Sequence, residues 1–144
     1  MDENNTPLES ARNSLAKIWF IGSGIVFLIL MVQSILGKYE SSLQEVWAWF
    51  VPTVLPTLAL MLGVIGAGAL MPDQDKRKVK QFFFSLSKYL SLFYLLILTL
   101  TILLEPFSNI PGIKLYNLSN YWLSPIQGLV VAAISVLFAS QDKA

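Results

Sequence analysis

The apolar run Val51–Pro72 constrains the fold of this chain more than any other stretch. It reads VPTVLPTLALMLGVIGAGALMP, with two prolines near its start and several small residues towards its end. A helix needs about 20 such residues to cross the roughly 30 Å hydrocarbon core of a bilayer. The run therefore predicts a membrane-spanning helix.

Three further apolar runs have a comparable length between their bounding charges. They lie between Lys17 and Lys38, between Lys88 and Glu105, and between Lys114 and Asp142. With 55% hydrophobic and 13% charged residues, the chain is too apolar for an ordinary soluble domain. We predict a single all-α integral membrane domain over residues 1–144. Its four transmembrane helices are expected at about 18–37, 46–71, 81–104 and 117–140.

The distribution of basic residues predicts the orientation in the membrane, because loops rich in Lys and Arg stay in the cytoplasm. One side of the predicted membrane has Arg12, Lys17, Lys76, Arg77, Lys78, Lys80, Lys88 and Lys143. The other side has Lys38 and Lys114. We therefore predict that both termini are cytoplasmic.

Two helix starts carry capping signals. Thr6-Pro7-Leu8-Glu9 matches a capping box with Thr6 as N-cap. It predicts an amphipathic arm over residues 6–17 that lies on the cytoplasmic surface, as an interfacial anchor or, alternatively, as a partner-binding arm.

The fourth helix has two alternative starts, near Asn117 or at the capping box of residues 124–127. Between the third and fourth helices, Lys114 is a candidate ion-pair partner for Glu105.

The second predicted helix has a packing face. Pro52 and Pro56 remove backbone donors and predict a kink. Small residues follow on the same face at helical spacing and allow another helix to approach closely. They are Ala59, Gly63 and Ala67, with Gly66 beside them. A matching stripe on the fourth helix consists of Gly128, Ala132, Ser135 and Ala139. The two stripes are expected to pack on each other or on a neighbouring subunit.

A basic cluster, Lys76, Arg77, Lys78 and Lys80, lies in the predicted cytoplasmic loop. Such a cluster determines topology and contacts anionic lipid headgroups. The alternative interpretation is a binding site for an anionic ligand.

The segment Ser119–Ala133, SNYWLSPIQGLVVAA, resembles segments of small multi-span membrane modules in bacterial conflict and antiphage systems. The resemblance covers this segment alone. It implies a membrane-acting component of a defence system, located in the bacterial inner membrane, and it carries over no catalytic residues.

The sequence argues against an enzyme. It contains no cysteine and no histidine, which excludes thiol chemistry and His-ligated haem or zinc. No ionisable residue lies in the middle of a predicted span, where ion-coupled transporters place theirs. The formal net charge of +1 argues against a nucleic-acid partner. We expect a non-enzymatic protein without a cofactor or a metal.

Two functions remain open. In the first, the protein self-assembles into a homo-oligomer and forms or gates a pore in the bilayer. The residues that would line such a pore are Gln33, Thr53, Thr57 and Gln127. In the second, the protein is a membrane anchor or accessory subunit that docks a protein partner at its cytoplasmic face.

Overall fold

The structure is a computed structural model that describes residues 5–70 and 78–139. It contains four long helices: α1 (Leu8–Ile35), α2 (Leu43–Leu70), α3 (Gln81–Leu104) and α4 (Gly112–Ala139). Each is long and apolar enough to cross a membrane. The predicted class, an all-α membrane protein with four spanning helices, is therefore confirmed.

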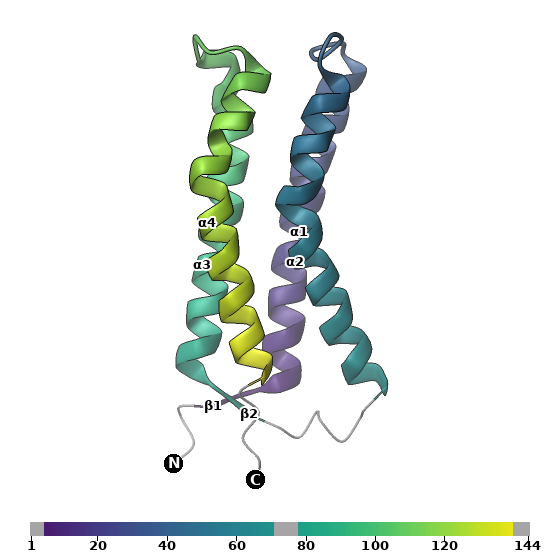
Figure 1. The fold of residues 1–144 in the computed structure, drawn as a ribbon. Coiled ribbons are helices and arrows are strands. Elements are labelled where there is room, and N and C mark those ends of the chain that lie inside the picture. Colours follow the sequence, from purple (N-terminus) through teal and green to yellow (C-terminus); the bar gives the residue numbers. More distant parts are fainter. Residues whose placement is uncertain (1–4, 71–77, 140–144) are drawn as a thin grey trace.

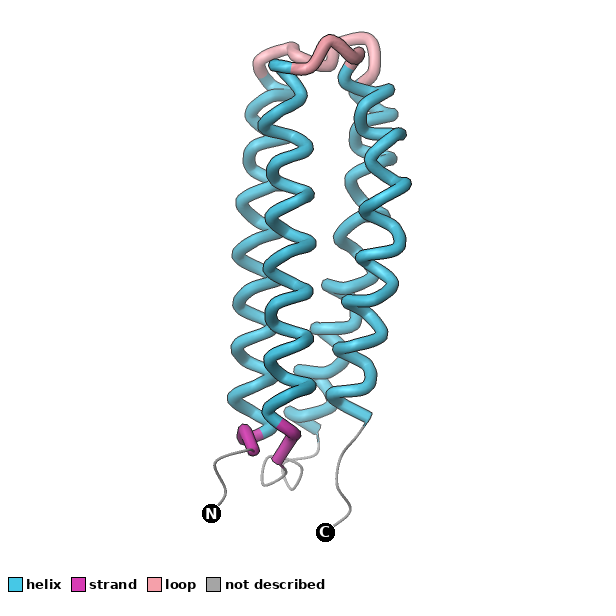
Figure 2. The backbone as a smooth tube through the Cα atoms, turned by 90° about the vertical axis from the view of Figure 1, so that its left-hand side faces the viewer, coloured by secondary structure: helices cyan, strands magenta, loops and turns pink. Residues whose placement is uncertain are grey.

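The helices form an up-and-down bundle (Figure 1). Helix α1 packs on α2 and α3, and α4 packs on the same two helices, so α1–α4 and α2–α3 are the diagonals. The loop 36–42, the short 3-10 helix η2 (Glu105–Phe107) and the loop after it lie at one end, which we call the loop end (Figure 2). Asn5 and Ala139, the first and last residues described, lie at the opposite end.

That opposite end, the strand end, carries a two-stranded antiparallel sheet. Strand β1 (Asn5–Pro7) pairs with β2 (Lys78–Lys80), with Thr6 opposite Val79. The predicted Thr6 cap is wrong, because Thr6 belongs to this strand. Pro7 takes the N-cap position without a side-chain bond to the helix, and the Thr6 hydroxyl donates instead to Gln81 Oε1.

The predicted amphipathic arm is the first part of α1 and continues into the span without a break. Leu8, Ala11 and Leu15 are at most 2% exposed. Val79 of β2 is also buried and covers the same end of the bundle. One face of residues 8–17 therefore packs on the bundle, while Glu9, Ser10 and Asn13 on the other face are exposed.

Helix α4 begins earlier than either predicted start. Its first residue is Gly112, and Leu115 N–H donates to Pro111 O at 3.0 Å. Pro125 lies within the helix, so residues 124–127 do not begin it. The first turns of α4 stay helical because Tyr116, Ser119 and Leu123 are buried against the other helices.

Three tryptophans connect the helices of the bundle by hydrogen bonds to serines of neighbouring helices. Each indole N–H donates to a serine hydroxyl: Trp19 to Ser91 (2.9 Å), Trp47 to Ser34 (3.2 Å) and Trp49 to Ser119 (3.2 Å). These bonds join α1 to α3, α2 to α1 and α2 to α4. Trp49 is buried inside the bundle, where its N–H has a partner.

Candidate functional site between α2 and α4

Helix α2 bends beyond its two prolines, and its second half diverges from the rest of the bundle (Figure 1). Pro56 has no N–H, so the carbonyl of Pro52 loses its helical donor. Gln127 Nε2 of α4 donates to Pro52 O at 3.2 Å and to Thr53 O at 2.9 Å. Tyr94 of α3, fully buried, reaches across the diagonal and donates to Thr53 O at 2.6 Å. Side chains of α3 and α4 thus donate to backbone carbonyls at the bend.

A polar cleft lies between α2 and α4 in the half of the bundle nearest the loop end. Its volume is about 450 Å³, and we call it the outer cleft. From α2 it is lined by Glu45, Ala48, Trp49, Pro52 and Thr53. From α4 it is lined by Ile113, Asn117, Asn120, Ser124 and Gln127. Its polar groups include a carboxylate, three side-chain amides and two hydroxyls.

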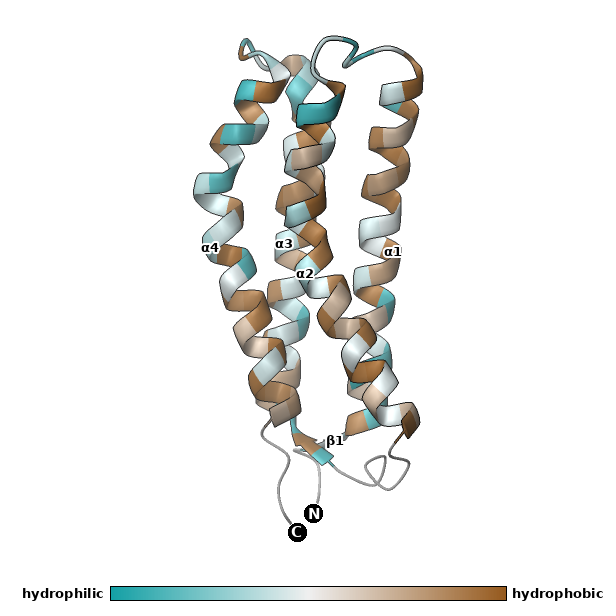
Figure 3. Ribbon diagram, turned by 45° about the vertical axis from the view of Figure 1, so that its right-hand side comes forward, coloured by the Kyte–Doolittle hydropathy of each residue, from teal (hydrophilic) through white to brown (hydrophobic). Residues whose placement is uncertain are grey.

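The polar residues of the outer cleft form a stripe on α4. Asn117, Asn120, Ser124 and Gln127 follow one another at steps of three and four residues, so they share one helix face. Figure 3 shows hydrophilic residues gathered on this half of α4. This spacing was readable in the sequence. Of these four residues, only Gln127 was predicted to line a site.

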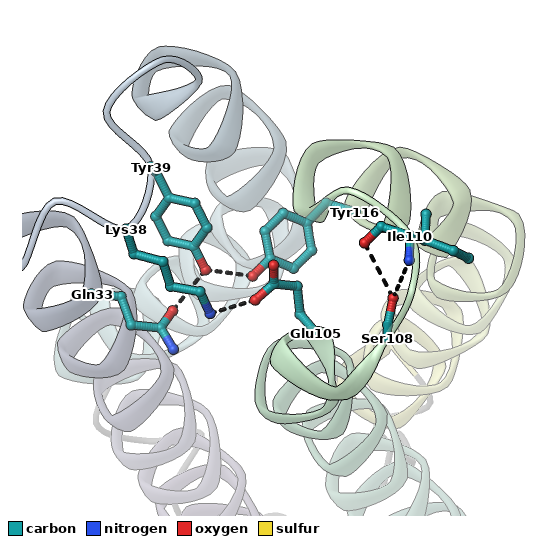
Figure 4. A network of polar contacts seen from close by, with 7 residues as sticks. All are labelled: Gln33, Lys38, Tyr39, Glu105, Ser108, Ile110 and Tyr116. Carbon is teal, nitrogen blue, oxygen red and sulfur yellow. Dashed lines mark hydrogen bonds and ion pairs between the residues drawn. The ribbon is translucent and has the colours of Figure 1, made fainter.

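The loop end is closed by a polar network (Figure 4). Tyr39 donates to Gln33 Oε1 at 2.7 Å, so the Tyr116 hydroxyl, 2.6 Å away, donates to Tyr39. Lys38 pairs with Glu105, which corrects the expected Lys114–Glu105 pair. The network joins the loop after α1 to the start of α4 and leaves Gln33 bonded inside the bundle.

The same network explains why α4 begins with a glycine. A Cβ at Gly112 would lie 2.6 Å from Glu105 Oε1. That carboxylate approaches the first turn of α4, where negative charge is favoured by the helix dipole. Gly112 therefore allows the close approach that the ion pair with Lys38 requires.

A second hollow, the inner groove, lies between the diverging half of α2 and the ends of α1 and α4. Its volume is about 420 Å³. It is lined by Leu8, Arg12, Ala59, Leu60, Gly63, Val64, Ala67 and Phe138. The predicted face Ala59, Gly63 and Ala67 thus opens onto a groove. A Cβ at Gly63 would meet no atom within 4 Å.

The remaining small residues line neither hollow. Gly66 on α2 and Gly128, Ala132, Ser135 and Ala139 on α4 are exposed on the bundle surface. Added Cβ atoms at Gly66 and Gly128 would also meet nothing within 4 Å. Within the described part of the chain, the α2 and α4 stripes do not pack on each other. A close contact of α2 is instead made at Gly68, which is not one of the residues predicted to form the packing face. Gly68 lies against the guanidinium of Arg12 on α1.

The four residues predicted to line a pore have different surroundings. Thr53 and Thr57 are buried, and Thr53 donates to Phe50 O at 2.5 Å. Gln33 belongs to the loop-end network, and only Thr53 and Gln127 border the outer cleft. Of the basic cluster, Lys76 and Arg77 lie outside the described residues, while Lys78 and Lys80 belong to β2.

Comparison with protein-family models, with curated proteins and with solved structures found no match. Among residues 5–70 and 78–139, no group of three carboxylate, imidazole or thiol side chains could hold a metal ion.

Proposed function

We propose that the chain is a multi-pass protein of the bacterial inner membrane that self-assembles and forms or gates a pore. The observation that carries the proposal is the exposure of its small-residue faces. Small residues let membrane helices approach closely and gain van der Waals contact. Gly63, Gly66 and Gly128 have open space beside them in the single chain, so close packing there needs a second copy.

The two hollows between α2 and α4 support a path along this side of the molecule. The outer cleft is polar and extends to Gln127, which is midway along α4. The inner groove continues towards the strand end and is mainly apolar. A polar vestibule followed by an apolar constriction is the arrangement of pores that gate by dewetting.

The exposed polar stripe adds a second reason for assembly. Asn117, Asn120 and Ser124 are exposed in the single chain. Unsatisfied polar groups in hydrocarbon cost several kcal/mol each. A neighbouring copy that covers this side would keep lipid away from these groups and leave room for water.

The test of assembly is the mass of the protein in lipid nanodiscs. We expect an oligomer for the wild type and a shift towards monomers for Gly63→Leu, because the larger side chain fills the contact face. Gly24→Leu is the matched control, since Gly24 on α1 also has nothing within 4 Å and lies outside both stripes. A wild-type monomer at all protein concentrations would overturn the proposal.

The test of the pore is ion flux through liposomes that contain the purified protein. We expect flux for the wild type and for Gly24→Leu, and reduced flux for Gly63→Leu. An oligomer without flux would favour the second candidate function, a non-conducting anchor or accessory subunit. The observation in favour of that candidate is that Gln33, Thr53 and Gln127 all make hydrogen bonds within the bundle.

The resemblance of residues 119–133 to antiphage membrane modules makes a defence effector the proposed setting for this pore. This segment lies in α4 and includes three residues of the outer cleft: Asn120, Ser124 and Gln127. Expression of the protein with and without Gly63→Leu, followed by phage challenge, tests this setting. Equal plating efficiency of phage on both strains and on an empty-vector strain would reject it.

A further inference from the structure

The outer cleft is rich in hydrogen-bond acceptors. Pro52 has no N–H, so the carbonyl of Ala48 lacks its usual helical donor four residues on. Both residues line the cleft, and among the described residues no side chain donates to Ala48 O. The freed carbonyl of Ala48 is therefore an acceptor at the wall of the cleft. It differs from the carbonyl of Pro52, which Gln127 satisfies.

Gln127 adds a further acceptor. Its amide nitrogen is used in the two bonds to the α2 backbone, at 3.2 and 2.9 Å. Its Oε1 has no donor among the described residues and belongs to the cleft lining. Asn117, Asn120 and Ser124 supply three more side-chain oxygens on the same face of α4.

The charge of the outer cleft is negative. Glu45 is the one charged residue that lines it among those described. Lys114 lies outside the cleft and shares with Glu45 a separate, smaller hollow of about 330 Å³. Lys38 is paired with Glu105. In surroundings of low polarizability, a single carboxylate raises the local concentration of cations.

We propose that the outer cleft is a binding site for a small monovalent cation that keeps part of its hydration shell. Calcium takes six to eight oxygen ligands that include several carboxylates, and magnesium is usually bound by one or two carboxylates together with phosphate groups, whereas this cleft combines one carboxylate with neutral oxygens. At about 30 Å³ for each water, the 450 Å³ cleft has room for a cation with its first shell. Freed backbone carbonyls beside side-chain oxygens also bind monovalent ions in transporters with interrupted helices.

The inference goes beyond the proposed function, because a cation can bind here whether or not the protein conducts. It also names the ion class that a pore along this side would admit. Flux and binding are therefore measured separately. Binding without flux would support the cation site and reject the pore. Flux without binding would support the pore and reject the cation site.

The experiment uses the full chain in phosphatidylcholine nanodiscs, which carry no net lipid charge. The midpoint of thermal unfolding is followed in NaCl, in KCl and in N-methyl-D-glucamine chloride at equal ionic strength. A ligand of the folded state raises this midpoint in a saturable way. We expect Na⁺ or K⁺ to raise it and the bulky organic cation to leave it unchanged.

Two variants and one control locate the effect. Glu45→Gln should weaken the apparent affinity at least about tenfold, because a hydrogen bond or contact to a charged group is lost. Asn120→Asp should raise the affinity by adding a second carboxylate to the same cleft. Glu40→Gln removes an equal charge from the loop end, outside the cleft, and should respond as the wild type.

Three outcomes would overturn the inference. They are an equal response to all three salts, an unchanged response in Glu45→Gln, and an unchanged affinity in Asn120→Asp. If Glu45→Gln fails to fold, as judged by far-ultraviolet circular dichroism, Asn120→Asp alone decides the question.

Discussion

At the scale of single residues, the bundle is held together by polar contacts between helices more than by its apolar surface. The lipid tails around a membrane protein are as apolar as its own side chains, so helices gain little from hydrophobic burial. The three tryptophan–serine bonds and the Gln127 and Tyr94 bonds to the α2 backbone supply specific contacts instead.

The first prediction concerns the bond between Trp19 and Ser91. Trp19→Phe keeps a large ring beside Tyr94 but removes the N–H, and should lower the free energy of unfolding by about 1 kcal/mol. The measurement is reversible unfolding in mixed detergent and dodecyl sulfate micelles. Trp122→Phe, at a side chain that is 41% exposed, is the control and should have no effect.

The second prediction compares two neighbouring glycines of α2. A Cβ at Gly68 would overlap the guanidinium of Arg12, whereas a Cβ at Gly66 meets nothing within 4 Å. Gly68→Ala should therefore displace the Arg12 guanidinium and destabilise the protein by about 1 kcal/mol, because the flexible end of this side chain relieves part of the overpacking. Gly66→Ala should be neutral or stabilise it by up to about 1 kcal/mol, because alanine favours helix. Equal effects of the two changes in the same unfolding assay would contradict the placement of Arg12.

At the scale of helices, α2 contains two prolines, and the carbonyl that Pro56 leaves without a helical donor is bonded from another helix. Its first half is fixed by Trp49, by the carbonyl bonds of Gln127 and Tyr94, and by the stack of Trp49 on Tyr116 at 4.4 Å. Its second half diverges beside the inner groove. The bend therefore separates a well-held half of the helix from a less supported one.

The third prediction tests the link between the proline and the glutamine. Gln127→Leu should cost about 1–2 kcal/mol, because it leaves the carbonyl of Pro52 without a donor. In a Pro56→Ala background the new N–H can bond to Pro52 O, so Gln127→Leu should cost less there. A double-mutant cycle measures this coupling, and additive effects would show that the two residues act independently.

At the scale of the whole molecule, the strand end and the loop end differ in charge. Arg12, Lys17, Lys78, Lys80 and Lys88 belong to the strand-end half of the described chain, and Lys38 and Lys114 belong to the loop end. By the positive-inside rule we propose that the strand end faces the cytoplasm.

The fourth prediction follows from this charge difference. A green fluorescent protein fused after Ala144 should fluoresce, and an alkaline phosphatase fused there should be inactive. Changing Lys76, Arg77, Lys78 and Lys80 together to alanine should produce a mixed or inverted topology. A fully retained orientation would show that Arg12, Lys17 and Lys88 determine the topology by themselves.

The four helices could be predicted from the sequence, because apolar runs of sufficient length leave few other structures in a membrane. The starts of α1 at Leu8 and of α4 at Gly112 could not be predicted from the sequence. Polar residues beside an apolar run pack inside the bundle only when other elements cover them. The small residues of α2 could be assigned to one face by counting. Whether Gly63 or Gly68 contacts α1 closely depends on the position of α1. The spacing of residues within α2 does not give that position.

The pairing of β1 with β2 has a consequence for how the protein is made. Asn5–Pro7 leave the ribosome long before Lys78–Lys80, and the whole α1–α2 hairpin is synthesised between them. The sheet therefore cannot form until α1 and α2 have been synthesised and the chain has reached the start of α3. Its formation closes the hairpin into a loop, so the start of α1 reaches its final place only after the middle of the chain has been inserted.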